Sequence, residues 1–150
     1  MKPIYILNGP NLNRLGKREP EIYGTTTLAE IEILCRRAAG DRAIRFLQTN
    51  AEAEMIGWIH EAIDEGAGIV INAAAWTFTS LAILDALKMF PGPIIELHIS
   101  NIHRREEIYH NSYVSKAASG VIVGLGAQGY PLAVSSLLDI LSAKNGIRQG

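Results

Sequence analysis

Five short apolar runs alternate along the chain with longer stretches in which apolar residues recur at helical spacing. Uninterrupted apolar runs of this length are typical of strands covered on both faces, as in a parallel sheet. Repeated alternation of strand and helix predicts one doubly wound α/β sandwich over residues 1–150. The expected strands cover residues 4–7, 43–47, 68–71, 93–97 and 120–123.

Helical patterns fill the segments between these runs. Thr27 and Glu30 match a capping box that opens one helix, and Asn50 is expected to be the N-cap of the next. In such sheets ligands lie beyond the carboxyl ends of the strands, so the segments after the first, third and fourth strands are the places to expect a site. The expected helices run from Thr27 to about Ala39, from Asn50 to about Glu65, from near Thr79 to before Pro91, from Arg104 to Tyr109 and from Pro131 to Ala143.

The third of these helices, FTSLAILDALKMF, is apolar on nearly every side yet contains Asp85. A helix of this kind is rarely left facing water, and an unpaired buried carboxylate is costly. The pattern favours burial against a neighbouring subunit as well as against its own sheet. An acid at the polar edge of an ordinary core helix is the alternative.

Composition narrows the class of protein. The chain has 48% hydrophobic residues and a net charge of −1, which suits a packed domain and gives no general case for nucleic acid or anionic membranes as partners. No apolar stretch approaches the ~20 residues that span a bilayer, and no signal-peptide pattern opens the chain. The only cysteine, Cys35, lies in a helical apolar pattern and is expected to be a buried structural thiol. A cytoplasmic location is the default.

The first candidate site segment is the polar stretch at residues 8–24, which its glycines and prolines predict to be non-helical. It contains Asn11, Arg18 and Tyr23. A tyrosine is a poor base at its usual pKa of ~10, but a nearby guanidinium favours the phenolate. Arg18 shares the segment with Tyr23 and could act in this way. A solvated loop with a half-exposed tyrosine is the alternative interpretation.

Two further segments follow the third and fourth strands. Asn72 ends the third strand and is expected to face the cleft, with Thr77, Thr79 or Ser80 able to cap the next helix. Glu96 and His98 are two residues apart in the fourth strand, so they point to the same face. A carboxylate orients an imidazole beside it, and such a histidine can donate a proton to a leaving hydroxyl. A purely structural histidine is the alternative.

Three other site types fit less well. The four histidines form no compact metal-ligand motif, so no metal is expected. Gly124, Gly126 and Gly129 match a dinucleotide fingerprint, but too little chain follows for a nucleotide-binding unit, and a tight turn is favoured. A receiver domain needs paired acids at the ends of its first and third strands. This chain has Asn8 and Asn72 there, so a receiver domain is not expected.

Four blocks of the chain resemble those of type II 3-dehydroquinate dehydratases in order and spacing: NGPNLNRLGKREPEIYG, NAAAWTFTS, ELHISNIHRREE and SGVIVGLGAQGYPLA. The resemblance implies a flavodoxin-like three-layer sandwich with a five-stranded parallel sheet. It implies a homo-dodecamer built as a tetramer of trimers. It also implies dehydration of 3-dehydroquinate to 3-dehydroshikimate, by anti elimination through an enolate, with a small molecule as substrate and no cofactor, metal or Schiff base.

The resemblance also implies roles for individual residues. Tyr23 would remove the proton beside the ketone, and Arg18 would lower its pKa. His98, oriented by Glu96, would protonate the departing hydroxyl. The other implied site residues are Asn11 at a water that stabilises the enolate oxygen, Asn72 and the backbone around Ile99 and Ser100 at the substrate carboxylate, Arg105, and Asp85, which would reach a neighbouring subunit's site.

Phe78 and Tyr109 depart from the family's usual histidine and arginine, which contact ring hydroxyls of the substrate. Hydrogen bonds to charged groups contribute about 1.5–3 kcal/mol each, so their loss could weaken binding. A related cyclic hydroxyketone acid is therefore an alternative substrate. A non-catalytic oligomeric binding protein is a second alternative, and a nucleotide-binding flavodoxin-like module is a third.

Overall fold

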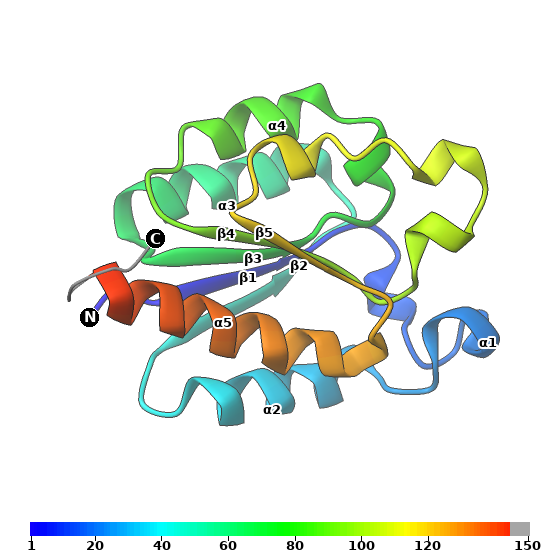
Figure 1. The fold of residues 1–150 in the computed structure, drawn as a ribbon, viewed down its shortest axis with the longest axis horizontal. Helices are drawn as coiled ribbons and strands as arrows, with labels where there is room; N and C mark the ends of the chain where they lie inside the picture. The colour runs from blue at the N-terminus through cyan, green and yellow to red at the C-terminus, as the bar shows by residue number, and fades with distance from the viewer. Residues whose placement is uncertain (145–150) are drawn as a thin grey trace.

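The structure is a computed structural model that describes residues 1–144. Its centre is a parallel sheet of five strands, in the order β2-β1-β3-β4-β5 (Figure 1). This order is that of a flavodoxin-like sheet, as expected. Each expected strand is confirmed to within one residue at either end. The strands are β1 (Ile4–Asn8), β2 (Ile44–Gln48), β3 (Gly68–Asn72), β4 (Ile94–His98) and β5 (Gly120–Val123).

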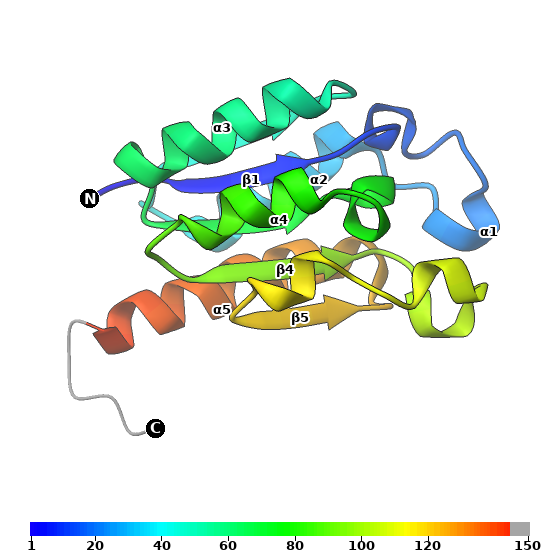
Figure 2. The ribbon, with the colours of Figure 1, turned by 90° about the horizontal axis from the view of Figure 1, so that it is seen from above.

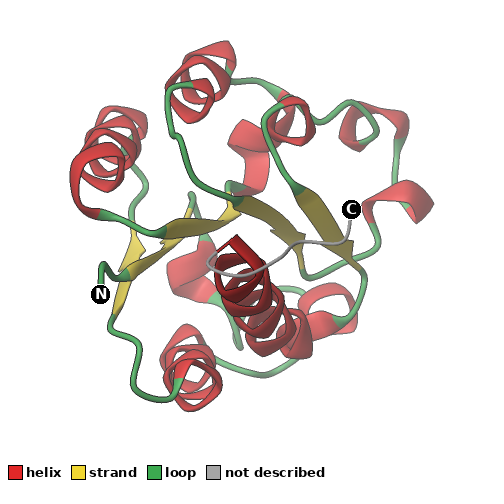
Figure 3. Ribbon diagram, turned by 60° about the vertical axis from the view of Figure 1, so that its left-hand side comes forward, coloured by secondary structure: helices red, strands yellow, loops and turns green. Residues whose placement is uncertain are grey.

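Helices cover both faces of the sheet and complete the three layers. Helices α2 (Leu28–Ala39) and α5 (Gly129–Lys144) lie on one face, and α3 (Glu52–Glu65) and α4 (Leu81–Lys88) lie on the other (Figure 1). Figure 3 shows helices on both sides of the sheet. Each face has its own core of buried, mostly aliphatic side chains. Between these two cores, every residue of β1, β3 and β4 is buried. The sheet therefore holds its strand ends rigidly.

The capping box at the start of α2 is confirmed. The backbone N–H of Glu30 donates to the Thr27 hydroxyl at 3.2 Å, and the Thr27 N–H donates to the Glu30 carboxylate at 3.1 Å. One turn further along, Cys35 is fully buried, and burial raises the pKa of its thiol to about 12. The expected structural thiol is therefore confirmed.

Three local expectations are wrong. Asn50 does not cap α3, because its side-chain oxygen accepts the backbone N–H of Asn11 at 2.8 Å, and Ala51 occupies the N-cap position. Residues 104–109 do not form one helix; two 3₁₀ turns, Ile102–Arg104 and Glu107–Tyr109, lie there instead. The stretch at residues 8–24 is not free of helix, since it contains the 3₁₀ turn Leu12–Arg14 and the short helix α1 (Pro20–Tyr23).

The glycine motif at residues 124–129 forms a turn, as favoured. Gly124 and Gly126 have φ values of +82° and +64°, which side chains rarely adopt. The N–H of Gly126 donates to the Ile99 carbonyl at 3.0 Å. A Cβ on Gly129 would lie 2.7 Å from Leu97, so its lack of a side chain lets α5 approach β4. The motif thus connects β5 to α5 and packs against the end of β4.

The carboxyl ends of the strands and the loops that follow them lie at one end of the molecule (Figure 2). Asn8 and Asn72 are paired in the register of β1 and β3, and Ile71 is paired with Glu96 in β4. Leu12 and Leu15 are buried and anchor the loop after β1. The three segments expected to carry a site therefore meet at this edge.

None of the helices in residues 1–144 combines the length and the apolar character that crossing a membrane requires. The single domain predicted over residues 1–150 includes positions 145–150, which lie outside the described residues.

Gly9 marks the closest approach of β1 to the chain after β3. A Cβ at this position would meet the Ala73 carbonyl oxygen at 2.4 Å, and a backbone atom cannot rotate away. We predict that Gly9→Ala lowers the free energy of unfolding by about 1–3 kcal/mol, the usual cost of overpacking. Gly57 in α3 is the matched control, since its Cβ would meet nothing within 4 Å.

Gly57→Ala is expected to raise the free energy of unfolding by about 0.4–1 kcal/mol, because alanine restricts the unfolded chain and favours helix. Urea denaturation at matched protein concentration measures both variants. Equal stability of Gly9→Ala and the wild type would contradict this account of the strand ends.

Candidate active site

A cavity of about 250 Å³ opens beyond the carboxyl ends of β1, β3 and β4. Its walls come from the loop after β1 with α1, from the 3₁₀ turn Ala74–Phe78 after β3, and from the segment after β4. In open α/β sheets ligands bind at this edge, near the point where the strand order reverses. Here that point lies between β1 and β3.

Ten of the twelve site residues expected from the sequence line this cavity. Glu96 lies behind His98, and Asp85 lies on α4 in a separate shallow depression. The ten that line the cavity are Asn11, Arg18, Tyr23, Asn72, Phe78, His98, Ile99, Ser100, Arg105 and Tyr109.

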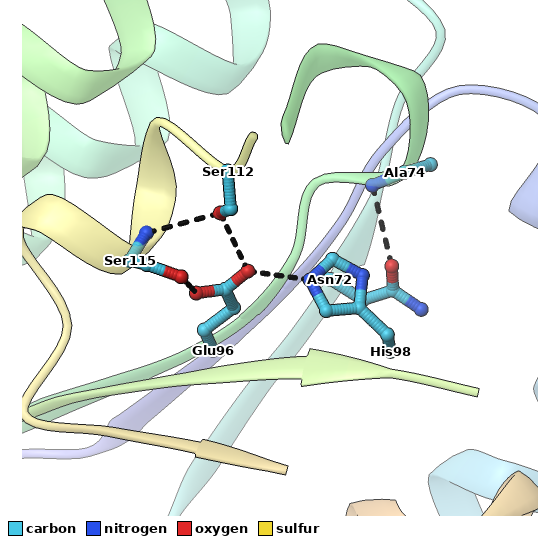
Figure 4. Close-up of polar contacts among 6 residues, drawn as sticks. All are labelled: Asn72, Ala74, Glu96, His98, Ser112 and Ser115. Carbon is cyan, nitrogen blue, oxygen red and sulfur yellow. Dashed lines mark hydrogen bonds and ion pairs between the residues drawn. The ribbon is translucent and has the colours of Figure 1, made fainter. Parts of the chain in front are cut away.

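Glu96 and His98 form a buried pair on one face of β4 (Figure 4). The Glu96 carboxylate lies 2.5 Å from His98 Nε2, and the two side chains are only 1% and 5% exposed. Because Nε2 is held by the carboxylate, the ring has one orientation and its other nitrogen is left for a ligand. The pair can supply a proton at the cavity wall.

Two serines complete the surroundings of Glu96. The Ser112 hydroxyl donates to Oε2 at 2.7 Å, and the Ser115 hydroxyl donates to Oε1 (Figure 4). Burial alone would raise the pKa of Glu96, but the hydrogen bonds from His98, Ser115 and Ser112 outweigh it and hold that pKa below its usual 4.5. Glu96 is therefore a buried carboxylate that stays ionised.

Tyr23 contacts two guanidinium groups. Arg105 Nη1 donates to the Tyr23 hydroxyl oxygen at 3.1 Å. Arg18 lies over the ring, with its Cζ 4.6 Å from the centroid, and forms an ion pair with Glu19 at 3.0 Å. The hydrogen-bond donor to the phenol oxygen is thus Arg105, whereas sequence reasoning expected Arg18 to be the guanidinium that acts on Tyr23. Arg105 therefore fixes the position of the phenol oxygen, and Arg18 covers one face of the ring.

Asn72 belongs to a fully buried polar network. Its Nδ2 donates to the Tyr130 hydroxyl at 3.0 Å, and that hydroxyl donates to Asn8 Oδ1 at 2.7 Å. Asn72 Oδ1 accepts the N–H of Ala74, which has an unusual φ of +52° (Figure 4). Within residues 1–144 only one of the two Nδ2 hydrogens is used, so the other is available to a ligand in the cavity.

Phe78 and Tyr109, the two departures from the family pattern, contact each other. Their ring centroids are 5.3 Å apart at an angle of 74°, an edge-to-face arrangement. Both side chains are half-buried and line the cavity. The side of the cavity where they lie is therefore aromatic.

Asp85 is exposed on the outer side of α4, next to Leu81 and Lys88. Leu81 is 62% exposed, and Met89 at the end of the helix is 53% exposed. Asp85 and Leu81 thus face outward, whereas the other large apolar side chains of α4, Ile83, Leu84 and Leu87, are buried. The expectation that α4 meets another subunit remains a prediction.

Sequence reasoning missed Ser112, Ser115 and Tyr130. They lie 16 or more residues from the groups they contact, so no local spacing links them. The i, i+3 spacing of the two serines was the available signal, because it places both hydroxyls on one side of the turn Val114–Lys116. Nothing in the sequence indicated that they face Glu96.

No group of three or more His, Cys, Asp or Glu side chains in residues 1–144 is arranged to hold a metal ion. The expectation of a site without metal or cofactor remains a prediction.

Comparison with known proteins assigns the family. The sequence profile of the family Dehydroquinase class II matches residues 2–138. The chain belongs to this family. Among its relatives, it is 58% identical over 145 residues to the 3-dehydroquinate dehydratase 2 of Agrobacterium fabrum, with 95% of this chain and 98% of that protein covered.

Two further similarities support the assignment to the Dehydroquinase class II family. The chain is 58% identical over 135 residues to the 3-dehydroquinate dehydratase of Streptomyces avermitilis, covering 88% of this chain and 85% of that protein. The crystal structure of the type II dehydroquinase from Propionibacterium acnes matches with a TM-score of 0.88 at 48% identity, covering 93% of this chain and 97% of that one. The resemblance seen in the sequence and the flavodoxin-like fold are both confirmed.

The ionised state of Glu96 makes a prediction about acid stability. Because its pKa is lower in the folded than in the unfolded chain, Glu96 stabilises the fold above pH ~4.5, and this contribution is lost as pH falls through the folded pKa. We predict that the free energy of unfolding falls more steeply below pH ~4.5 in the wild type than in Glu96→Gln. Urea denaturation at pH values from ~7 to ~3 measures the difference, and parallel pH profiles would refute it.

Proposed function

We propose that this Dehydroquinase class II member is a hydro-lyase that converts 3-dehydroquinate to 3-dehydroshikimate and water. The Tyr23 oxygen takes the proton on the carbon beside the ketone, and the electrons of that C–H bond form an enolate. The enolate then forms the new C=C bond as the C–O bond to the β-hydroxyl breaks. His98 donates a proton to the leaving oxygen, which departs as water in an anti elimination.

The observation that carries this proposal is that Tyr23 and His98 line the same cavity, each with a partner suited to its role. The Tyr23 oxygen accepts a hydrogen bond from the Arg105 guanidinium, and the Arg18 guanidinium lies over its ring. The buried carboxylate of Glu96 lies 2.5 Å from Nε2 of His98 and orients the imidazole toward the cavity for its role as the acid. A cavity of about 250 Å³ between such groups suits a small cyclic substrate.

The remaining lining residues divide between the two ends of the substrate. Asn11 would hold a water at the enolate oxygen, and its left-handed backbone is held by Asn50. Asn72, with its free N–H, would bind the carboxylate together with the backbone around Ile99 and Ser100. Phe78 and Tyr109 would contact the far side of the ring. The whole chain would form one catalytic domain that needs no metal or cofactor.

The alternatives raised by the sequence are less well supported. Relatives at 58% identity are named for 3-dehydroquinate, which does not favour another hydroxyketone acid. A non-catalytic binding protein or a nucleotide-binding module gives no reason for the buried Glu96–His98 pair and for two arginines at Tyr23. Dehydration of 3-dehydroquinate therefore stands as the proposed function.

We also propose that the chain acts in the cytoplasm as a homo-dodecamer, a tetramer of trimers. The exposed Leu81 and Met89 on α4 support contact with a second subunit, and Asp85 between them would reach that subunit's cavity. The net charge of −1 favours neither nucleic acid nor anionic membranes as partners.

We predict that Tyr23→Phe lowers turnover by ~10²–10⁴-fold, the range that general base catalysis contributes, while substrate affinity changes little. Formation of the conjugated enone, followed by ultraviolet absorbance, measures turnover, and calorimetry measures affinity. Tyr113→Phe is the matched control, since Tyr113 does not line the cavity and is expected to leave turnover unchanged. Full activity of Tyr23→Phe would rule out its role as the base.

Light scattering tests the proposed assembly. The expected mass is that of twelve chains of 16.3 kDa each. Leu81→Asp places a second carboxylate one helical turn from Asp85 and is expected to lower the mass through repulsion at the contact. A wild-type protein that remains monomeric at micromolar concentration would disprove the assembly and the role of Asp85 in it.

A further inference from the structure

One wall of the cavity is a continuous series of aromatic contacts that begins at His98. The Phe78 ring lies beside the imidazole, with centroids 6.0 Å apart and planes 26° apart. On its other side, Phe78 meets the Tyr109 ring edge to face at 5.3 Å. Edge-to-face pairs are directional, so the two rings fix each other's orientation as well as their distance.

The series continues from Tyr109 to the phenol of Tyr23 through Arg105. The Arg105 guanidinium carbon lies 4.2 Å from the centroid of the Tyr109 ring, which is close for a cation–π contact. From there Nη1 donates to the Tyr23 hydroxyl oxygen at 3.1 Å. The backbone of Arg105 is also held, because His110 Nε2 donates a hydrogen bond to its carbonyl oxygen at 2.8 Å.

We infer that Phe78 and Tyr109 are positioning residues: their paired rings set the place of His98 and of the Arg105 guanidinium, and through Arg105 the place of the Tyr23 hydroxyl. The inference deepens the proposed function and rests on it for the roles of His98 and Tyr23. It assigns to the rings a task separate from contact with the substrate.

The ring of Tyr109, rather than its hydroxyl, is the part that positions the Arg105 guanidinium. Both contacts of the side chain, to Phe78 and to Arg105, are made by the ring. Within residues 1–144 the Tyr109 hydroxyl makes no hydrogen bond. Tyr109→Leu therefore removes the aromatic face while keeping apolar bulk, and Tyr109→Phe keeps the face.

Kinetics on 3-dehydroquinate separate positioning from binding. We expect Tyr109→Leu to lower kcat about tenfold with KM changed less than ~3-fold, because a misplaced guanidinium affects the reacting groups more than substrate affinity. Tyr109→Phe is expected to recover most of the lost kcat. Ile33→Ala, exposed on α2, is the control that leaves both constants unchanged. A rise in KM in both Tyr109 variants, with kcat retained, would assign the hydroxyl to the substrate and overturn the inference.

A double-mutant cycle tests whether the two rings act as one unit. Phe78→Leu alone is expected to lower kcat by a similar factor. The double variant Phe78→Leu/Tyr109→Leu should then lose less than the product of the two single losses, because the second substitution removes a support already gone. Multiplicative losses, or a lower melting temperature with unchanged kcat in the single variants, would show that the rings only fill space.

Crystal structures of the ligand-free variants test the inference without an activity measurement. In Tyr109→Leu the Arg105 guanidinium is expected to leave the Tyr23 oxygen, to a separation beyond ~3.5 Å, and in Tyr109→Phe it is expected to stay. An unmoved Arg105 in Tyr109→Leu would overturn the inference. A wild-type protein that does not dehydrate 3-dehydroquinate would instead overturn the proposed function, and the structures would still report on the positioning.

Discussion

The parallel register of β1, β3 and β4 is the constraint on which the site depends. All three strands end at one level of the sheet, and their residues are buried on both faces. Three segments that are far apart in the sequence must therefore leave the core side by side. Gly9, which approaches the Ala73 carbonyl with no room for a side chain, shows how closely two of them are packed. The cavity is a consequence of this packing.

The proposed acid and the proposed base are held in place by different parts of the structure. The acid half, Glu96 with His98, is part of a buried strand and is held by two serine hydroxyls. The base half, Tyr23, lies on the short helix α1 in a surface loop and is half-buried. Its hydroxyl is placed by a guanidinium from the segment after β4. One strand end thus organises both halves, directly at His98 and through Arg105 at Tyr23.

Much of this arrangement could be predicted from local sequence, and the limits have physical causes. Strands and the capping box depend on neighbouring residues, so apolar runs and the Thr27–Glu30 spacing identified them. Asn50 was misjudged because its oxygen is used by Asn11, which is 39 residues away, and a long-range partner overrides a local preference. Residues 102–109 split into two turns whose backbone bonds are local, yet the side chains of Ile102, Arg105 and Tyr109 face the cavity rather than a helix neighbour.

In the candidate site too, features set by local sequence could be predicted and long-range contacts could not. Residue types at strand ends and in the segments that follow them indicated Asn72, His98 and Tyr23, because these segments converge whatever the details of packing. The contact of Arg105 with Tyr23 joins residues 82 apart, and the Phe78–Tyr109 pair joins two segments of different loops. Such contacts depend on the angles at which loops leave the sheet, which no spacing rule encodes. They are also the contacts that connect the acid to the base.

In the proposed reaction, Tyr23 and His98 act on opposite faces of one substrate ring. Stereospecifically deuterated 3-dehydroquinate tests this, because the two hydrogens on the carbon between the ketone and the carbon bearing the leaving hydroxyl can be labelled separately and followed by mass spectrometry of the product. Anti elimination by Tyr23 and His98 predicts loss of the label that lies anti to the departing hydroxyl and retention of the other. Loss of the label on the same face as the hydroxyl would contradict it.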